Sequence, residues 1–272
     1  MTSLIELYPN AGVERQLQGL HAVDNVRSRP RGPDGAYVYT GYIASIDGRI
    51  ALEGSSGAPM ATRNDRDWRH FQELMMQADV VLASGRYVRD KKVGGTAQSI
   101  VPEADDASVA DLVEGRRQAG IPLRPALAIV TSKASFDPEV ASGLADDVIA
   151  VLGEEPDAET RATLEGHGLS VVAAGRNGRV TGDLLVEALG GLGHSVVFSA
   201  AGPQVFHTLI PVLDALYLTL AGRLLGGRAY STLLEGDELE VPPSFDLASA
   251  FLDPEGPGDS VQLFLEFTRH RS

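Results

Sequence analysis

Residues 37–51 read YVYTGYIASIDGRIA, an apolar-rich run that leads directly into a polar residue and a glycine. An apolar run followed by Asp47-Gly48 predicts a β-strand, Tyr37–Ile46, that ends in a turn. Gly48 has no Cβ, so the chain can turn sharply there or let a ligand approach its backbone. Together with the small apolar tail Ile50-Ala51, this turn can lie close to a flat ring.

Strand-like and helix-like segments alternate from Ala36 onward. Several strand-like segments, such as Val80–Leu82 and Leu127–Val130, are continuous apolar runs, which are typical of strands buried on both faces. The alternation predicts an α/β fold with a mostly parallel central sheet and helices on both faces. The predicted strands are Tyr37–Ile46, Val80–Ser84, Leu127–Thr131, Val148–Leu152, Leu169–Ala173, Ser195–Ser199, Ala215–Leu220 and Val261–Phe267. The predicted helices are Asp65–Gln77, Ser108–Gln118, Ala158–Glu165, Asp183–Leu189 and Pro203–Leu213.

Two segments depart from this rhythm. Residues 1–34 end in the Pro/Gly/Arg stretch Arg29–Asp34, so we expect an N-terminal extension, with a short helix around Val13–Leu20, before one domain over residues 35–272. The segment Asp90–Pro125 contains Gly94-Gly95 and an acidic run, and it predicts a surface loop plus one helix.

The composition excludes several classes of function. The chain has 272 residues, no cysteine and a net charge of −14, so thiolate metal sites and cysteine nucleophiles are excluded and nonspecific binding to nucleic acid is disfavoured. No apolar run approaches the roughly 18 residues that a membrane span needs, and the N-terminus lacks the pattern of a secretory signal. We therefore expect a cytoplasmic protein that binds neither membrane nor nucleic acid.

Common catalytic motifs are missing. The sequence contains no HExxH, P-loop, GxSxG or GxGxxG, and its six histidines lack metal-ligand spacing, so we predict no metal site. Tyr87–Lys91 spells YxxxK, a catalytic pair of short-chain dehydrogenases. That family also needs a glycine-rich turn after its first strand, which is absent here.

Small and basic residues follow three of the predicted strands. These loops are Ser84-Gly85-Arg86, Thr131-Ser132-Lys133 and Ser199–Pro203. Glycine lets backbone N–H groups face a ligand, and an adjacent cation supplies charge for a phosphate. Each loop alone is ordinary for an α/β protein. At the carboxyl ends of parallel strands, however, the three would converge on the edge of the sheet where nucleotides bind.

These motifs together resemble the reductase domain of riboflavin biosynthesis, the RibD C-terminal domain, within the dihydrofolate-reductase-like superfamily. The resemblance covers roughly residues 36–270 and follows the order of the family's motifs. The matching segments are Ala44–Ala51, Ser55-Ser56-Gly57, Ala78–Leu82, Gly85-Arg86, Gly202-Pro203, Leu213–Leu216 and Leu224–Gly227.

The resemblance implies a fold with an antiparallel C-terminal strand and NADPH as the hydride donor. It also implies an NADPH-dependent reduction of the ribosyl carbon in a phosphoribosylamino-pyrimidine. By analogy, the cofactor-binding residues would be Ala44 and Ile50 at the nicotinamide, Gly85 and Arg86 at the phosphates, Ser132 and Lys133 at the adenosine 2′-phosphate, and Ala201, Gly202 and Pro203 at the pyrophosphate. Residues near the substrate would be Ser45, Thr62, Arg63 and Arg66.

Two further expectations accompany the resemblance. Asp47 is the candidate catalytic carboxylate, although an aspartate before glycine commonly binds its own turn instead. The family forms dimers, so we expect a homodimer, to which the apolar stretch Leu213–Leu225 could contribute.

The sequence departs from the family where charged or polar binding groups are expected. Gly41 replaces a lysine of the family and Met75 replaces an arginine. Ala200 replaces a glutamate and Val88 replaces a threonine. Losing an arginine–phosphate contact typically costs a few kcal/mol, so we expect a divergent member and leave its substrate open. Arg63, Arg66 or Arg69 could compensate.

Two alternatives remain open. The first is reduction of a pterin or another heterocycle in the manner of dihydrofolate reductase. That reaction needs a buried carboxylate, for which Asp65, Asp67 and Glu73 are candidates. The second is a relative that binds a nucleotide or a partner protein without turnover.

Overall fold

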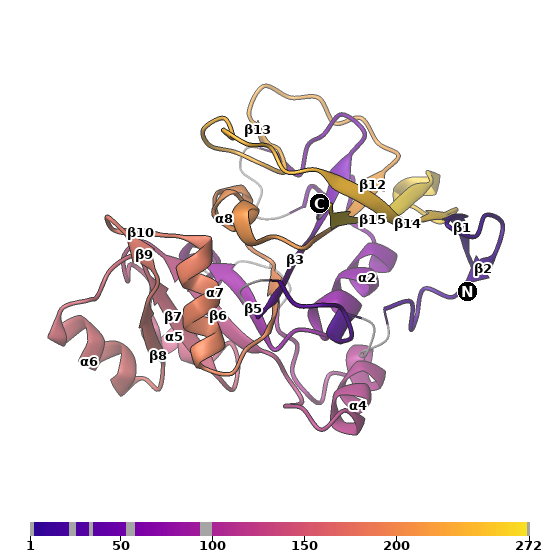
Figure 1. The fold of residues 1–272 in the computed structure, drawn as a ribbon. Helices are drawn as coiled ribbons and strands as arrows, with labels where there is room; N and C mark the ends of the chain where they lie inside the picture. Colours follow the sequence, from indigo (N-terminus) through magenta and orange to yellow (C-terminus); the bar gives the residue numbers. More distant parts are fainter. Residues whose placement is uncertain (1–2, 22–25, 33–34, 53–57, 93–99, 271–272) are drawn as a thin grey trace.

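The computed structural model describes residues 3–21, 26–32, 35–52, 58–92 and 100–270. Eleven strands form one sheet in the order β2-β1-β14-β15-β12-β3-β11-β5-β6-β7-β8 (Figure 1). In chain order these strands are β1 (Leu4–Tyr8), β2 (Glu14–Arg15), β3 (Tyr37–Ser45), β5 (Val80–Ser84), β6 (Ala126–Thr131), β7 (Val148–Leu152), β8 (Ser170–Ala173), β11 (Val196–Ser199), β12 (Ala215–Ala221), β14 (Phe245–Asp253) and β15 (Gln262–Arg269).

The sheet has a parallel and an antiparallel part. All pairs from β12 to β8 are parallel, whereas β15, β14, β1 and β2 add antiparallel pairs at the other end. Two short ribbons accompany it, β4 (Ala51–Leu52) with β13 (Tyr230–Ser231) and β9 (Gly175–Arg176) with β10 (Arg179–Val180). The expected α/β class is confirmed, and the C-terminal region contributes two antiparallel strands rather than one.

Helices cover both faces of the parallel part, as expected. One core lies beneath α2 (Asp65–Met75), α3 (Gly85–Lys92), α4 (Ala110–Gln118), α5 (Pro138–Ser142) and α6 (Ala158–Gly166). The other lies beneath α7 (Gly182–Gly191) and α8 (Pro203–Leu209). Three 3₁₀ turns complete the fold, at Ala107–Val109, Ile210–Val212 and Pro257–Asp259.

The start of α2 follows from its sequence. The Asn64 side chain accepts a hydrogen bond from the Asp67 amide at 2.8 Å, and Asp65 and Asp67 place negative charge in the first turn, where the helix dipole favours it. The buried residues Leu74 and Met75 fix the inner face of the helix at its other end. This cap sets where the first turn lies relative to the sheet.

The predicted helix at Val13–Leu20 is wrong. Glu14-Arg15 instead forms β2 and pairs with Leu4-Ile5 of β1, and Gly12 and Gly19 adopt positive φ angles that a helix does not contain. The strands β1 and β14 and the helices α3 and α5 were not predicted. The single helix expected within Asp90–Pro125 is confirmed as α4, whereas residues 93–99 and the motif Ser55-Ser56-Gly57 lie outside the described residues.

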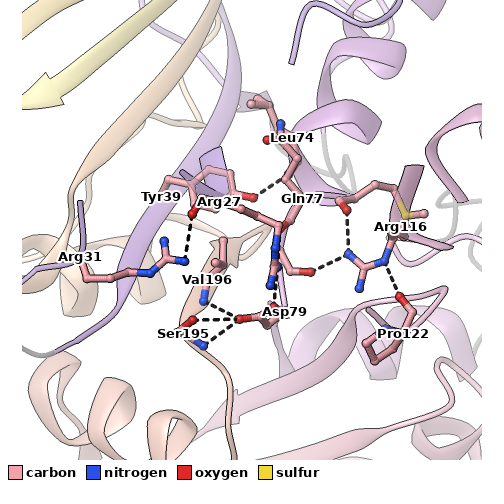
Figure 2. Close-up of polar contacts among 12 residues, drawn as sticks. Arg27, Arg31, Tyr39, Leu74, Gln77, Asp79, Arg116, Pro122, Ser195 and Val196 are labelled. Carbon is pink, nitrogen blue, oxygen red and sulfur yellow. Dashed lines mark hydrogen bonds and ion pairs between the residues drawn. The ribbon is translucent and has the colours of Figure 1, made fainter. Parts of the chain in front are cut away.

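Asp79 organises the edge of the sheet where the parallel strands begin (Figure 2). Its carboxylate accepts hydrogen bonds from the Ser195 and Val196 amides, both at 2.9 Å, and from the Arg27 guanidinium at 2.5 Å. Burial alone would raise the pKa of Asp79, but the Arg27 contact and the two amides outweigh it and the pKa is lowered. The expected motif Ala78-Asp79 therefore joins β5 to β11.

Arg116 of α4 completes this edge by binding backbone carbonyls. Its buried guanidinium donates to the carbonyl oxygens of Met76, Ala78 and Pro122 at 2.6–2.8 Å (Figure 2). The Met76 and Ala78 carbonyls lie between the end of α2 and the start of β5, where helix C-terminal oxygens lack partners within the helix, and the Pro122 carbonyl lies between α4 and β6. Burial lowers the pKa of Arg116 to about 10.

Within the described residues, no helix combines the length and the apolar content that crossing a membrane would take.

Candidate functional site

The carboxyl ends of β12, β3, β11, β5 and β6 lie along one edge of the sheet because these five neighbouring strands are parallel. This arrangement brings together the segments expected from the sequence, which are Ser45–Gly48 after β3, Ala200–Pro203 after β11, Gly85-Arg86 after β5 and Ser132-Lys133 after β6. Gly85-Arg86 was expected to be a loop and instead begins α3. Loops at this edge of an open α/β sheet commonly bind nucleotides. We call this row the site edge.

Direct contacts join neighbouring loops of the site edge. The Tyr42 hydroxyl on β3 donates to the Ala201 carbonyl at 2.8 Å, and the Ala200 amide donates to the Leu82 carbonyl on β5 at 3.0 Å. A Cβ on Gly85 would lie 3.3 Å from the Thr131 hydroxyl at the end of β6. The loop after β11 is therefore tied to β3 and β5, and Gly85 leaves room for the Thr131 side chain at the end of β6.

Exposed cations mark one part of the row. The Arg86 side chain is 72% exposed, with its guanidinium 3.7 Å from Asp90, and Lys133 is exposed on the neighbouring loop. Gly202 caps α8 and has open space where a side chain would begin. Arg86 and Lys133 thus offer positive charge that could attract a phosphate, and Gly202 leaves the backbone at the start of α8 accessible.

Asp47 uses both carboxylate oxygens to hold the site edge together. It accepts hydrogen bonds from the Leu225 amide at 3.2 Å and the Gly226 amide at 2.9 Å. It also accepts from the Ser45 hydroxyl and the Arg49 guanidinium, both at 2.5 Å. The first and last motifs of the expected family order are thus hydrogen-bonded to each other.

This bonding pattern supports the turn-binding alternative for Asp47. The hydrogen bonds from Ser45 and Gly226 lower the pKa of Asp47 to about 2, so its carboxylate is a weak base and is ionised at neutral pH. The contacts describe a residue that positions two loops, and a catalytic role for Asp47 stays a prediction.

Replacing Asp47 by alanine is expected to free the loop after β12. Hydrogen exchange at the Leu225 and Gly226 amides should accelerate at least tenfold, on the order of the loss of one protected contact. Asp106→Ala, which removes an exposed carboxylate bound to the Ser108 amide, is the matched control and should leave both amides unchanged. Unchanged exchange in Asp47→Ala would show that other contacts hold this loop.

Asp67 is a second carboxylate on the side of the sheet covered by α2. It lies in the first turn of that helix and accepts a hydrogen bond from the Thr219 hydroxyl on β12, whose register partner is Ile43 on β3. Burial raises the pKa of Asp67 to about 6, despite the Thr219 contact, which lowers it. A carboxyl group with such a pKa retains a proton near neutral pH and can donate it.

The other candidate carboxylates have different surroundings. Asp65 is exposed. Glu73 is fully buried and accepts hydrogen bonds from the Gly19 and His21 amides at 2.7 and 3.0 Å, so it anchors the N-terminal segment to α2. Asp67, at the sheet-facing start of α2, therefore fits the carboxylate of a pterin-type reaction better than exposed Asp65 or the anchoring Glu73.

The expected substrate residues on α2 and before it are already engaged. Thr62 is buried and donates to the Pro59 carbonyl, and Arg63 donates to the Ala58 carbonyl. Arg66 forms an ion pair with buried Asp253 at 2.7 Å, and Arg69 contacts Glu73 and Asp111. A substrate phosphate would have to compete with these partners for either arginine.

The residues that depart from the family pattern lie in or beside the apolar core. A Cβ on Gly41 would lie 3.5 Å from the Phe198 ring and 3.7 Å from Leu74. Met75 is fully buried in the same core, and Ala200 packs against it. Phe198, Leu74 and Met75 therefore occupy space beside positions where the family carries charged groups. In the described part of the chain, no group of three or more histidine and acidic side chains is arranged to hold a metal ion.

The strand order and the helices on both faces define an α/β fold with a mostly parallel central sheet. A family model described as the RibD C-terminal domain matches residues 36–256. The chain belongs to that family. A comparison with curated protein sequences gave no match.

Solved structures share the fold at low sequence identity. A pyrimidine reductase-like protein from Corynebacterium diphtheriae is 21% identical, with a TM-score of 0.61, over 87% of this chain and 93% of that one. The riboflavin biosynthesis reductase Rib7 of Saccharomyces cerevisiae is 14% identical, with a TM-score of 0.57, over 93% and 97% of the two chains. A deaminase and 5-amino-6-(5-phosphoribosylamino)uracil reductase of Thermotoga maritima is 18% identical, with a TM-score of 0.55, over 86% of this chain and 57% of that one.

Proposed function

We propose that this protein is an NADPH-dependent reductase of the riboflavin-pathway pyrimidine-reductase type, with Asp67 as its proton donor. The observation that carries the proposal is the protonatable Asp67 carboxyl beside the parallel strands whose ends form the site edge. Family membership supports a reductase acting on a small molecule.

The residues of the site edge fit a dinucleotide. Arg86 and Lys133 offer exposed positive charge in a chain of net charge −14, and Gly85 and Gly202 leave backbone accessible. We propose that Arg86 and Gly85 bind the phosphates, Ser132 and Lys133 the 2′-phosphate, and Ala201, Gly202 and Pro203 the pyrophosphate. Ala44 and Ile50 would border the nicotinamide, with Ser45 facing the substrate.

The chemistry needs one proton from the protein. When bound, NADPH supplies a hydride to the ribosyl carbon, and the ring oxygen that leaves this carbon takes up a proton. The Asp67 carboxyl holds that proton, and the Thr219 hydroxyl keeps the carboxyl oriented. Asp47 positions the loops after β3 and β12 around the reacting groups.

The substrate is the part of the proposal that the sequence divergence affects most. Gly41, Met75 and Ala200 remove family binding groups, so the substrate could differ in its phosphate or in its ring. A pterin or another heterocycle is the second candidate, because the Asp67 carboxyl would serve that reduction equally well. A nucleotide-binding relative without turnover is the third.

The first test compares thermal unfolding with NADPH, with NADH and without ligand. A ligand at 100 times its dissociation constant adds about 2.7 kcal/mol, which corresponds to a rise in Tm of about 5–10 °C. We expect this rise with NADPH. If neither dinucleotide raises Tm, the reductase proposal is wrong.

Replacing the two cations should remove the preference for NADPH. In Arg86→Ala/Lys133→Ala we expect the affinity for NADPH to fall at least tenfold, on the order of one charged hydrogen bond, while the affinity for NADH changes less. Arg117→Ala, on the exposed surface of α4, is the control. Oxidation of NADPH with the phosphoribosylamino-pyrimidine and with dihydrofolate then separates the two substrate classes.

We further propose that the protein is cytoplasmic and homodimeric, with residues 1–34 as an extension of the reductase domain at 35–272. The strand β1 within that extension pairs with β14, so the extension widens the sheet.

A further inference from the structure

A network of polar side chains joins the start of α2 to the antiparallel part of the sheet. Asn64, which caps α2, pairs its side-chain amide with that of Gln262, the first residue of β15. The two hydrogen bonds of this pair measure 3.0 and 3.2 Å. Arg66 binds Asp253, the last residue of β14, at 2.7 Å, and Gln262 donates to the same carboxylate oxygen at 2.9 Å. We call these four residues the α2 network.

Asn64 does more in this network than cap a helix. Its Oδ1 atom accepts from the Asp67 amide at 2.8 Å, and a serine or an aspartate would supply that acceptor equally well. Its Nδ2 atom donates to Gln262, and among the side chains that cap helices well asparagine alone carries an NH₂ donor beside the acceptor. Asn64 therefore ties the first turn of the helix to β15.

The partners of this turn on the sheet are buried. Asp253 and Gln262 are both fully buried, and such groups are tolerated in a protein interior when their hydrogen bonds are made. Asp253 accepts from Arg66, from Gln262 and from the Glu255 amide at 3.1 Å. Since apolar residues often stabilise a fold as well as a buried ion pair does, the network contributes a fixed orientation more than it contributes stability.

The register of the strands places the α2 network close to the partner of Asp67. Thr219 on β12, whose hydroxyl binds the Asp67 side chain, lies two positions before Ala221, the register partner of Gln262. The Asp67 side chain and, through Asn64, the Asp67 backbone amide are therefore both held by β12 and β15. This double attachment restrains the rotation and the shift of the first turn of α2.

We propose that Asn64 and Gln262 are positioning residues for the proton donor, an inference that rests on the function proposed above. Together they hold the first turn of α2 against the sheet, so that the Asp67 carboxyl keeps its place beside Thr219. A displacement of about 1 Å in an active site can lower a rate about 10²-fold. Cutting the link between Asn64 and Gln262 should therefore slow the reaction, although neither side chain supplies the proton.

Two neutral substitutions cut this link and leave the helix capped. Asn64→Ser keeps an acceptor for the Asp67 amide, and Gln262→Met keeps the length of the side chain without its amide. We expect each to lower kcat about 10- to 100-fold, while the KM for NADPH stays close to that of the wild type. Asp157→Ser changes the exposed cap of α6 in the same way, and this control should keep the wild-type kcat.

The double variant shows whether the two residues act as one unit. Both substitutions break the same pair of hydrogen bonds, so Asn64→Ser/Gln262→Met should lower kcat no further than the larger of the two single effects. Losses that multiply in the double variant would mean that the residues act separately, and this result would overturn the inference.

A titration without substrate tests the positioning independently of turnover. In the wild type, the carbon NMR signal of the Asp67 carboxyl should report the pKa of about 6 that burial produces. In Asn64→Ser we expect this pKa to fall by about one unit toward its ordinary value, because a looser turn admits water to the carboxyl. The substitution leaves the charge of the surrounding groups unchanged, which are Asp65, Arg66, Asp253 and Glu255. If Asn64→Ser fails to fold, Gln262→Asn, which shortens the amide by one methylene, replaces it.

The outcomes separate this inference from the proposed function. If the wild type oxidises no NADPH with either substrate class, or if Asp67→Asn keeps the wild-type kcat, the proton donor and its positioning are both refuted. If Asp67→Asn lowers kcat, but Asn64→Ser and Gln262→Met keep the wild-type kcat and the wild-type pKa of Asp67, the donor stands and the positioning inference alone is wrong.

Discussion

Asp67→Asn is expected to lower kcat by about 10²- to 10⁴-fold, the contribution of a positioned general acid. An amide cannot donate the proton that the leaving oxygen needs, and it fills the same space beside Thr219. The wild-type rate should fall as pH rises through about 6, because burial raises the pKa of Asp67 to that value. Steady-state kinetics from pH 5 to 9 measure both effects.

The control for this experiment lies two residues away. Asp65 is an exposed carboxylate in the same helical turn, so Asp65→Asn changes the same charge without removing the proposed donor. It should keep both the wild-type rate and its pH dependence. If Asp67→Asn retains the decline above pH 6, another group donates the proton.

The same substitution should stabilise the protein at high pH. A carboxyl whose pKa rises on folding holds its proton more tightly when folded, so the folded state loses stability as pH rises from about 4 to above 6. Asparagine removes this loss, and at pH 8 the free energy of unfolding should increase, by at most about 3 kcal/mol. Lower activity with higher stability would distinguish a functional group from a structural one.

Asp79→Ala is expected to destabilise the fold by about 3–5 kcal/mol, the range for removing one partner of a buried ion pair. The change leaves the Ser195 and Val196 amides without acceptors and the Arg27 guanidinium without its partner. For a chain of this size, Tm should fall by about 10 °C or more. Denaturant titration at pH 7 measures the free energy of unfolding directly.

Exposure separates this pair from an ordinary surface pair. Asp183 binds Arg176 at 2.7 Å with both side chains about half exposed, and Asp183→Ala should cost less than about 1 kcal/mol. Since the pKa of Asp79 is lowered on folding, its stabilisation should be lost as pH falls through that lowered pKa. Equal losses from the two alanine variants would mean that Asp79 does not anchor β5 to β11.

The parallel part of the fold could be read from the sequence because its strands are continuous apolar runs. Val80–Ser84 and Val148–Leu152 were predicted with their observed bounds. The strand β14 was missed because Phe245–Asp253 shows neither strict alternation nor a long apolar run, and a bulge between Leu247 and Ser249 shifts its register. The helix α3 was missed because Gly85 begins it, and glycine at the end of a strand predicts a loop.

The site was predictable as a set of loops but not as a set of contacts. The order of the parallel strands alone brings Gly85, Lys133 and Gly202 to the site edge, independently of side-chain contacts. The bonds from Asp47 to Leu225 and Gly226, in contrast, join residues nearly 180 positions apart. No local pattern contains such a pairing. The raised pKa of Asp67 likewise depends on how its side chain is buried beside Thr219 of β12, which a sequence of alternating charges does not reveal.

The position of β3 in the sheet has a consequence for biosynthesis. Both of its neighbours, β11 and β12, come late in the chain, and β11 begins 151 residues after β3 ends (196 − 45). At about 5–20 residues per second, a ribosome needs roughly 8–30 s to supply the first partner. During that interval the strand that bears the first motif has both hydrogen-bonding edges open, so the nascent chain must be shielded from other strands until β11 and β12 have been made.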